Sequence, residues 1–231
     1  MSRRRPALGS LTWPETERSA GHPAGVLAVA VGSLEQHGPH LPLDTDARIA
    51  GALAAALSRR CRDVVVGPAI PYGASGEHER FPGTISVGQA ALGLFVLELI
   101  RSASATFPRV VLVNGHGGNA EALHGAAARS RSEGRDVRVW SPRLPGDAHA
   151  GRTETSLMLA LFPDAVRLDR AEAGVVEPIG ALLPRLRRDG VRAVSPSGVL
   201  GDPRGATAEE GEALLAAALE DLGTAVERWA S

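Results

Sequence analysis

Short valine-rich runs alternate with longer segments of helical periodicity, and this alternation constrains the fold more than any other feature. Val26–Val31 is a dense apolar run bounded by glycines, which is typical of a strand buried on both faces. The predicted strands are 26–31, 64–66, 109–113 and 137–140, and the predicted helices are 47–60, 89–106, 120–134, 155–161 and 209–230. This order predicts an α/β fold with a mostly parallel sheet flanked by helices.

The chain is long enough to bury one compact core. It has 231 residues, 44% of them hydrophobic, so we expect a single domain over residues 1–231. No sustained apolar segment follows Arg3–Arg5, so we expect residues 1–8 to be a disordered start rather than a targeting signal. The longest apolar run, near 92–100, is interrupted by Glu98 and is too short to span a bilayer. We therefore expect a soluble, cytoplasmic protein with no membrane partner.

Charge and composition exclude several function classes. The formal net charge of −1 gives no basic field and aromatic residues make up only 3%, so we expect no nucleic-acid partner. All 25 basic residues are arginine, which excludes a Schiff-base lysine and a phosphate-loop lysine. The single cysteine, Cys61, excludes an intramolecular disulfide.

The polar segment 32–46 is the most informative part of the chain. It contains Glu35, His37, His40 and Asp46, and such oxygen and nitrogen donors suit Zn²⁺, Mn²⁺ or Fe²⁺. In extended backbone, Glu35 and His37 would share one side. Taken singly, Asp46 could be a helix cap, Glu35 a surface charge and His40 a hydrogen-bonded loop residue. Their joint occurrence favours Glu35, His37 and Asp46 as metal ligands.

A second polar turn, Asn114–Asn119, follows another predicted strand and adds His116 to the candidate ligands. Its three glycines let the backbone approach a ligand closely. A glycine-rich turn could instead cradle a phosphate, but the chain has no lysine and the turn does not match G-x-G-x-x-G. Ligands of parallel sheets bind beyond the carboxyl ends of the strands, so we expect both polar loops to meet there.

The segment 147–156 opens a predicted helix and supplies two candidate catalytic residues. We interpret His149 as a proton donor and Glu154 as a metal ligand or an orienting carboxylate. The alternative is that Glu154 is favoured only by the helix dipole.

Two further pairs of residues are candidates for contacting substrate. Glu77 and His78 lie in the segment 75–84, which could line the pocket, and for His78 a structural role is equally open. Gly117 and Gly118 could offer backbone N–H groups to a tetrahedral oxyanion.

Together these motifs resemble the creatininase (creatinine amidohydrolase) family. The matching segments are Glu35–Pro42 with Asp46, Glu77–His78, Phe81–Ser86, Asn114–His116, and His149 with Glu154–Ser156, in order from about Val26 to Leu161. The resemblance implies a three-layer α/β/α fold, a two-metal site and assembly into a homo-oligomer, a hexamer in this family.

The resemblance also implies roles for the candidate residues. Glu35 and His116 would hold one metal, His37 would hold the other, and Asp46 would bridge the two. His149 would match the catalytic histidine of the family. The implied cofactor is one or two divalent ions, Zn, Fe(II) or Mn.

One position departs from the family pattern. Creatininase has a glutamate ligand of the second metal where this chain has Gly118. Either Glu154 or water replaces that ligand, or the second metal is weak or absent. The departure also argues against creatinine as the substrate.

Within the family, the chain most resembles the subgroup associated with mycofactocin biosynthesis. The segments that indicate it are Leu8–Pro14, Gly151–Leu157 and Val199–Pro203. This implies a peptidase that cleaves a radical-modified precursor peptide near its C-terminus and releases a core derived from the terminal Val-Tyr pair. Two alternatives stay open: a cyclic-amide or formamide hydrolase acting on a small heterocycle, and a non-catalytic binding protein stabilised by metal.

Overall fold

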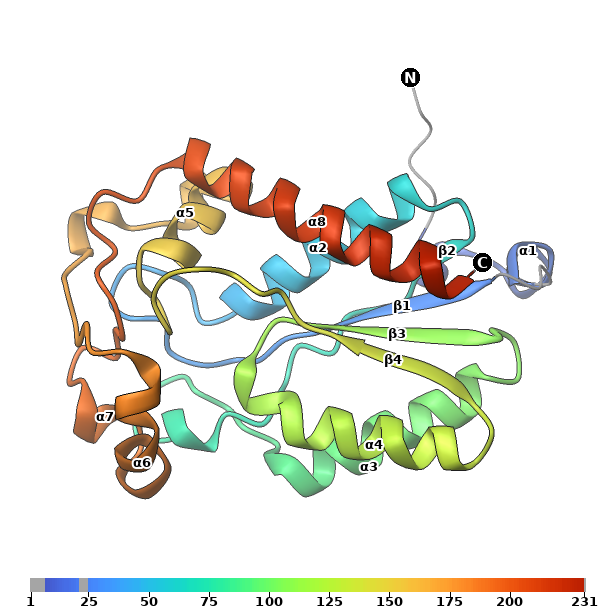
Figure 1. The fold of residues 1–231 in the computed structure, drawn as a ribbon, viewed down its shortest axis with the longest axis horizontal. Helices are drawn as coiled ribbons and strands as arrows, with labels where there is room; N and C mark the ends of the chain where they lie inside the picture. Colours follow the sequence, from blue (N-terminus) through green and yellow to red (C-terminus); the bar gives the residue numbers. More distant parts are fainter. Residues whose placement is uncertain (1–6, 21–24, 231) are drawn as a thin grey trace.

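One parallel sheet of four strands forms the centre of the computed structural model, which describes residues 7–20 and 25–230 (Figure 1). The strands are β1 (Val26–Val31), β2 (Val64–Val66), β3 (Arg109–Asn114) and β4 (Asp136–Trp140), in the order β2-β1-β3-β4. Every residue of β1 is buried, because the strand pairs with β2 and β3 and is covered on both faces.

Helices cover both faces of this sheet, so the fold has three layers (Figure 1). One layer contains α2 (Thr45–Arg60), α5 (Arg152–Leu161) and α8 (Ala208–Ala230), and the other contains α3 (Gly88–Ala103) and α4 (Ala120–Ser132). A hydrophobic core lies on each face of the sheet, and alternate residues of β1 point into one or the other. Val26 and Ala28 pack on the α2 side, and Leu27 and Val29 pack on the α3 side. The predicted fold class is confirmed.

A smaller cluster lies away from the sheet, where α6 (Ile179–Asp189) and α7 (Val191–Val194) pack against each other. Both helices contact the short 3-10 helix η2 (Gly76–His78). The remaining elements are α1 (Trp13–Ala20) and the 3-10 helices η1 (Leu8–Ser10), η3 (Gly117–Asn119), η4 (Pro163–Ala165) and η5 (Leu168–Arg170). Within the described residues, no helix combines the length and apolar character needed to cross a membrane.

The four predicted strands are confirmed, whereas several predicted helix limits are wrong. The second helix of the chain begins at Thr45 and α5 begins at Arg152, two and three residues earlier than predicted. Helices α1, α6 and α7 are not among the predicted elements. Of the start predicted to be disordered, residues 1–6 lie outside the described part of the chain, and Leu8 begins η1.

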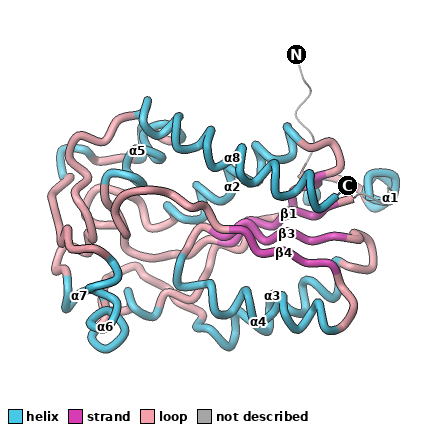
Figure 2. Tube along the Cα trace, in the orientation of Figure 1, coloured by secondary structure: helices cyan, strands magenta, loops and turns pink. Residues whose placement is uncertain are grey.

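The loops that follow β1, β3 and β4 gather at one end of the sheet, as Figure 2 shows. They span residues 32–44, 115–116 and 141–151, and they lead into α2, η3 with α4, and α5. Because the strands are parallel, their carboxyl ends all reach this edge, which brings the predicted site residues together.

Candidate active site and metal centre

Three side chains from different loops form an inner cluster, defined here as Glu35, Asp46 and His116. Glu35 follows β1, Asp46 lies in the first turn of α2, and His116 follows β3. All three are buried, Glu35 completely. His116 Nδ1 lies 3.2 Å from Glu35 Oε2 and 3.4 Å from Asp46 Oδ2. One oxygen or nitrogen from each residue could therefore coordinate a single metal ion.

Asn119 holds the loops of the inner cluster in place. Its Nδ2 donates hydrogen bonds to the Gly32 carbonyl (2.9 Å) and to Asn114 Oδ1 (3.1 Å). Its Oδ1 accepts one from the Ala74 N–H (2.8 Å). One buried amide thus joins the segments after β1, β2 and β3, which fixes the positions of the ligands that those segments carry.

A second group, the outer cluster, consists of His37, His149 and Glu154. His37 Nε2 lies 3.1 Å from Asp46 Oδ1 and 3.9 Å from Glu154 Oε2, so Asp46 faces both clusters. Glu154 Oε2 also accepts a 2.6 Å hydrogen bond from the N–H of Ala150, whose φ of 51° is unusual for a residue other than glycine. The outer cluster therefore contains a carboxylate despite the glycine at position 118.

Gly118 has no room for a side chain. A Cβ there would lie 2.3 Å from His116 Nε2, 2.6 Å from Glu77 Oε1 and 2.6 Å from the Ala74 carbonyl. Glu77 fills that space and pairs with His116 Nε2 at 3.4 Å, on the opposite side of the ring from the inner carboxylates. Such a carboxylate–histidine pair orients a metal-binding imidazole.

Gln36 was not among the predicted site residues, yet its amide connects the histidines of the site. The Gly38 N–H donates to Gln36 Oε1 (2.8 Å), which fixes the orientation of the amide. The Nε2 group can then donate its two protons to His78 Nδ1 (2.9 Å) and the Gly198 carbonyl (3.1 Å). Extended backbone would have directed Gln36 away from Glu35 and His37, so periodicity gave no signal for it.

These contacts define the protonated nitrogen of two neutral histidines. His149 Nε2 lies 2.8 Å from the Gln36 carbonyl and 3.0 Å from Gln36 Nε2. Because a carbonyl can only accept, we assign the proton to Nε2, which leaves Nδ1 facing Glu35 Oε1 at 3.8 Å. His78 accepts at Nδ1, so its Nε2–H faces the same Glu35 oxygen at 3.4 Å. The nitrogen of His149 available for proton transfer within the site is therefore Nδ1.

Burial and neighbouring charges oppose each other in the pKa values of the ligands. Burial alone would lower the pKa of His37, but Asp46, Glu154 and Glu35 raise it to about 10. Burial would raise the pKa of Glu35, but His116 and other nearby histidines hold it well below its usual range. Opposite charges thus hold the site together in the protein without metal, and a cation would displace the protons of these histidines.

The remaining histidines are held neutral. Burial, reinforced by the neighbouring His149, lowers the pKa of His78 to about 3 despite the Glu35 carboxylate. Burial and the charge of His37 lower the pKa of His149, and the same two causes lower that of His40 to about 4. Neutral imidazoles can accept a proton or bind a metal.

The inner cluster fits a cation. Glu35 Oε1 and Oε2 and Asp46 Oδ2 are buried, and none accepts a hydrogen bond from the described residues. Buried carboxylate oxygens without donors are costly unless they coordinate a metal or pair with a charge. The donor set of carboxylates and imidazole suits a divalent ion of the Zn, Mn or Fe(II) type.

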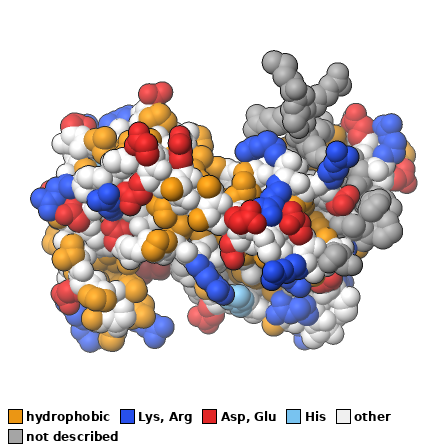
Figure 3. Space-filling view, turned by 45° about the horizontal axis from the view of Figure 1, so that its top comes forward, with side chains coloured by type: hydrophobic (Ala, Val, Ile, Leu, Met, Phe, Trp, Pro, Cys, Tyr) orange, Lys and Arg blue, Asp and Glu red, His pale blue; other side chains and the backbone are white. Residues whose placement is uncertain are grey.

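Both clusters open onto a pocket of about 860 Å³, a volume sufficient for a small ligand or a short peptide segment. Its walls come from η2, the turn after β3, the start of α5, and α6 with α7. Figure 3 shows the surface hollowed between the part that carries α6 and α7 and the part that carries α3 and α4. All ten predicted site residues lie in the clusters or line this pocket. They are Glu35, His37, Asp46, Glu77, His78, His116, Gly117, Gly118, His149 and Glu154.

Comparisons with known proteins agree with this geometry. The model of the creatininase family, described as creatinine amidohydrolase, matches residues 9–226. A "Mycofactocin precursor peptide peptidase" of Mycolicibacterium smegmatis is 51% identical over 93% of this chain and 89% of its own length. A solved "Creatininase Mn" superposes with a TM-score of 0.82 at 31% identity over 96% and 97% of the two chains. A creatininase variant of "Zn-Zn type" gives 0.83 at 29% identity over 97% and 98%.

Fold and site together define an α/β protein with a candidate metal centre at the carboxyl ends of its strands. The chain belongs to the creatininase family. It is a hydrolase that acts on carbon–nitrogen bonds, the chemistry of an amidohydrolase.

Proposed function

We propose that this protein is a metal-dependent peptidase that releases the modified, Val-Tyr-derived core from the C-terminus of the mycofactocin precursor peptide. The name of the relative at 51% identity supports this substrate. The observation that carries the hydrolytic part is the set of buried carboxylate oxygens of the inner cluster that accept no hydrogen bond from the described residues, beside an open pocket. A purely structural metal site would normally be closed by four protein ligands.

The inner cluster would hold one divalent ion, and His37 with Asp46 and Glu154 would hold a second. The related creatininases described as Mn and Zn-Zn types support Mn or Zn, and Fe(II) shares the same donor preferences. Such an ion, when bound, lowers the pKa of water and polarises the amide carbonyl. Glu154 takes the place of the glutamate that the family has at position 118.

The protein's own groups would provide the remaining chemistry. His149 is neutral and its Nε2–H is engaged by the Gln36 carbonyl, so Nδ1 would first accept a proton from the attacking water and then pass that proton to the leaving nitrogen. Backbone N–H groups of Gly117 and Gly118, which line the pocket, stabilise the developing oxyanion. Glu77 orients His116, and η2 places both Glu77 and His78 on the pocket wall.

The test is incubation of the metal-loaded protein with the modified precursor peptide, followed by mass spectrometry. Release of the core from the peptide supports the proposal. Turnover of a cyclic amide or formamide without peptide cleavage would favour a small-molecule amidohydrolase, and inertness toward all three would favour a binding protein. Elemental analysis of the same sample gives the metal and its ratio to the chain.

We also propose that residues 1–231 form one domain and that copies of it associate into a homo-oligomer, a hexamer by family resemblance. Exposed apolar side chains of α3 support association, since Leu94 is 61% and Phe95 55% exposed. Light scattering of the wild type and of Phe95→Glu tests it, with a smaller particle expected for the variant. A cytoplasmic location and the absence of nucleic-acid and membrane partners stay predictions.

A further inference from the structure

Helix α6 presents a broad apolar face with two edges. Leu182 and Leu186 form one edge and are buried against α7. Ile179 and Leu183 form the other edge and line the active-site pocket, where they are 43% and 39% exposed. Their spacing of four residues continues to Arg187, which lines the pocket as well. We call Ile179, Leu183 and Arg187 the α6 stripe.

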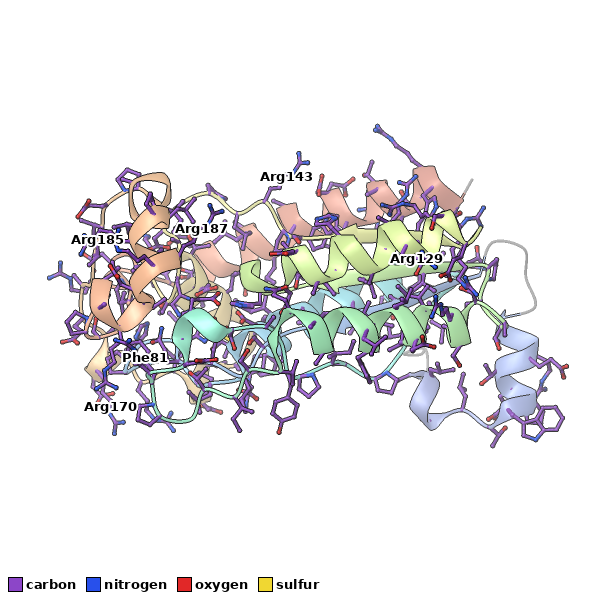
Figure 4. All side chains as sticks on the ribbon, turned by 90° about the horizontal axis from the view of Figure 1, so that it is seen from below. Phe81, Arg129, Arg143, Arg170, Arg185 and Arg187 are labelled. Carbon is purple, nitrogen blue, oxygen red and sulfur yellow. The ribbon has the colours of Figure 1, made fainter. Side chains whose placement is uncertain are left out.

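The guanidinium of Arg187 is available to a ligand. Among the described residues, none forms a hydrogen bond or an ion pair with Arg187. Other arginines of this wall are engaged: Arg188 pairs with Asp189 (2.8 Å), and Arg192 donates to the Arg80 carbonyl. In Figure 4, Arg187 lies on the side of α6 that faces the body of the protein, and Arg185 lies on the outer side.

The charges of the pocket favour an acidic group beside α6. The carboxylates of Glu77, Glu79 and Glu121 belong to the other walls. They repel an acidic side chain, whereas Arg187 attracts it. Arg80, Arg188 and Arg192 also line the pocket, but Arg188 is paired with Asp189 and Arg192 donates to the Arg80 carbonyl, so Arg187 is the pocket-lining guanidinium of α6 that has no partner among the described residues. The apolar side chains next to Arg187 suit an aliphatic or aromatic neighbour of that acidic residue.

The direction of the substrate follows from where it is cut. A peptide cleaved near its C-terminus has a short end that fits inside the pocket and a long end that must leave through the mouth. The exposed α6 stripe forms part of that mouth. The segment that crosses it is therefore the one N-terminal to the scissile bond.

We propose that the α6 stripe is the docking surface for the leader segment of the precursor peptide, with an apolar leader residue against Ile179 and Leu183 and an acidic leader residue paired with Arg187. This inference rests on the proposed function. It makes α6 a determinant of which peptides are cleaved, separate from the residues that hold the metal.

The first experiment measures cleavage of the modified precursor by the metal-loaded wild type, Arg187→Gln and Arg185→Gln. We expect Arg187→Gln to raise KM about fivefold with kcat unchanged, as the loss of one partly exposed ion pair should. Arg185→Gln, on the opposite face of the same helix, should match the wild type. A precursor whose acidic leader residues are replaced by their amides should show the same fivefold loss with the wild type and no further loss with Arg187→Gln. Equal KM values for all three proteins would overturn the inference and leave the proposed function intact.

The second experiment does not depend on turnover. A fluorescent peptide that comprises the leader alone is titrated with the wild type, Arg187→Gln and Leu183→Ser, and binding is followed by anisotropy. We expect Kd to rise about fivefold with Arg187→Gln and about tenfold with Leu183→Ser. If the leader binds in this way but no protein cleaves the precursor, the proposed function fails and the docking surface stands. A change in molar mass of Leu183→Ser, with leader binding unchanged, would identify the stripe as a contact between copies and overturn the inference.

Discussion

The inner and outer clusters meet at Asp46, which belongs to the inner cluster and contacts His37 of the outer one, but they are built differently. Two members of the inner cluster, Glu35 and His116, lie within a few positions of β1 and β3, and apart from Arg109 every residue of these strands is buried. The outer cluster also depends on α5, which the loop 141–151 connects to β4, and the side chain of Glu154 is 21% exposed. The inner carboxylate oxygens have no donor among the described residues, whereas Glu154 accepts one from Ala150.

This difference indicates how the two sites should behave. The inner oxygens gain most from a cation, because they are buried and accept no hydrogen bond from the described residues. The outer carboxylate already accepts a hydrogen bond from the Ala150 N–H, so it gains less from a cation. We therefore expect the inner site to bind metal more tightly, and we expect the outer site to be where members of the family differ in their ligands.

The largest effect should come from Asp46→Ala, because Asp46 faces both clusters. We expect metal content to fall nearly to zero and peptide cleavage to fall at least about a thousandfold. Elemental analysis and mass spectrometry measure the two effects. Asp44→Ala is the matched control, since Asp44 precedes the same helix but pairs only with Arg48 among the residues described. Full activity of metal-depleted Asp46→Ala would contradict a metal-dependent mechanism.

The next effect should separate the two clusters. Glu154→Gln keeps an acceptor for the Ala150 N–H but removes the carboxylate from the outer cluster. We expect the metal-to-chain ratio to fall from about two to about one, and kcat to fall about a hundredfold. Glu210→Gln, which alters a partner of Arg152 and Ser156 on another side of α5, should leave both values unchanged. Two tightly bound ions in Glu154→Gln would show that the outer site does not need this carboxylate.

A smaller effect should follow from Gln36→Met, which keeps the volume of the side chain but removes the donor to His78 Nδ1. We expect His78 to populate both tautomers and kcat to fall about tenfold, with KM nearly unchanged. His149 should keep its tautomer, because it donates to the backbone carbonyl of residue 36 rather than to the side chain. The ¹⁵N shifts of the zinc-loaded protein report both rings. A single unchanged tautomer of His78 would refute this role of Gln36.

The inner and outer clusters also differ in how far the sequence predicts them. The valine-rich strands and the ligands next to them were predictable, because burial and chain order place them at one edge of a parallel sheet. The orientation of Gln36 and the filling of the space at Gly118 by Glu77 depend on tertiary contacts between distant segments. Helix α6 escaped prediction because it contains Pro184 and arginines that obscure its apolar face.

The smallest predicted effect concerns His40, which connects the two halves of the site. Its Nε2 lies 2.9 Å from Thr155 Oγ1, so it joins the loop that carries Glu35 to the helix that carries Glu154. Burial and the charge of His37 lower its pKa from 6.5 to about 4. Between these two pH values the unfolded chain binds more protons than the folded one, so the stability that neutral His40 provides is present above pH 6.5 and is lost as the pH falls toward 4.

His40→Gln should therefore make the metal-depleted protein less sensitive to acid. We expect the fall in Tm between pH 7 and pH 5 to be about 3 °C smaller in this variant than in the wild type. The exposed His124 offers a control, and His124→Gln should follow the wild type. His78, whose pKa is also lowered, keeps some acid sensitivity in every variant, so the informative quantity is the difference between proteins. An identical fall in Tm for His40→Gln and the wild type would mean that acid does not act through the connection between the two clusters.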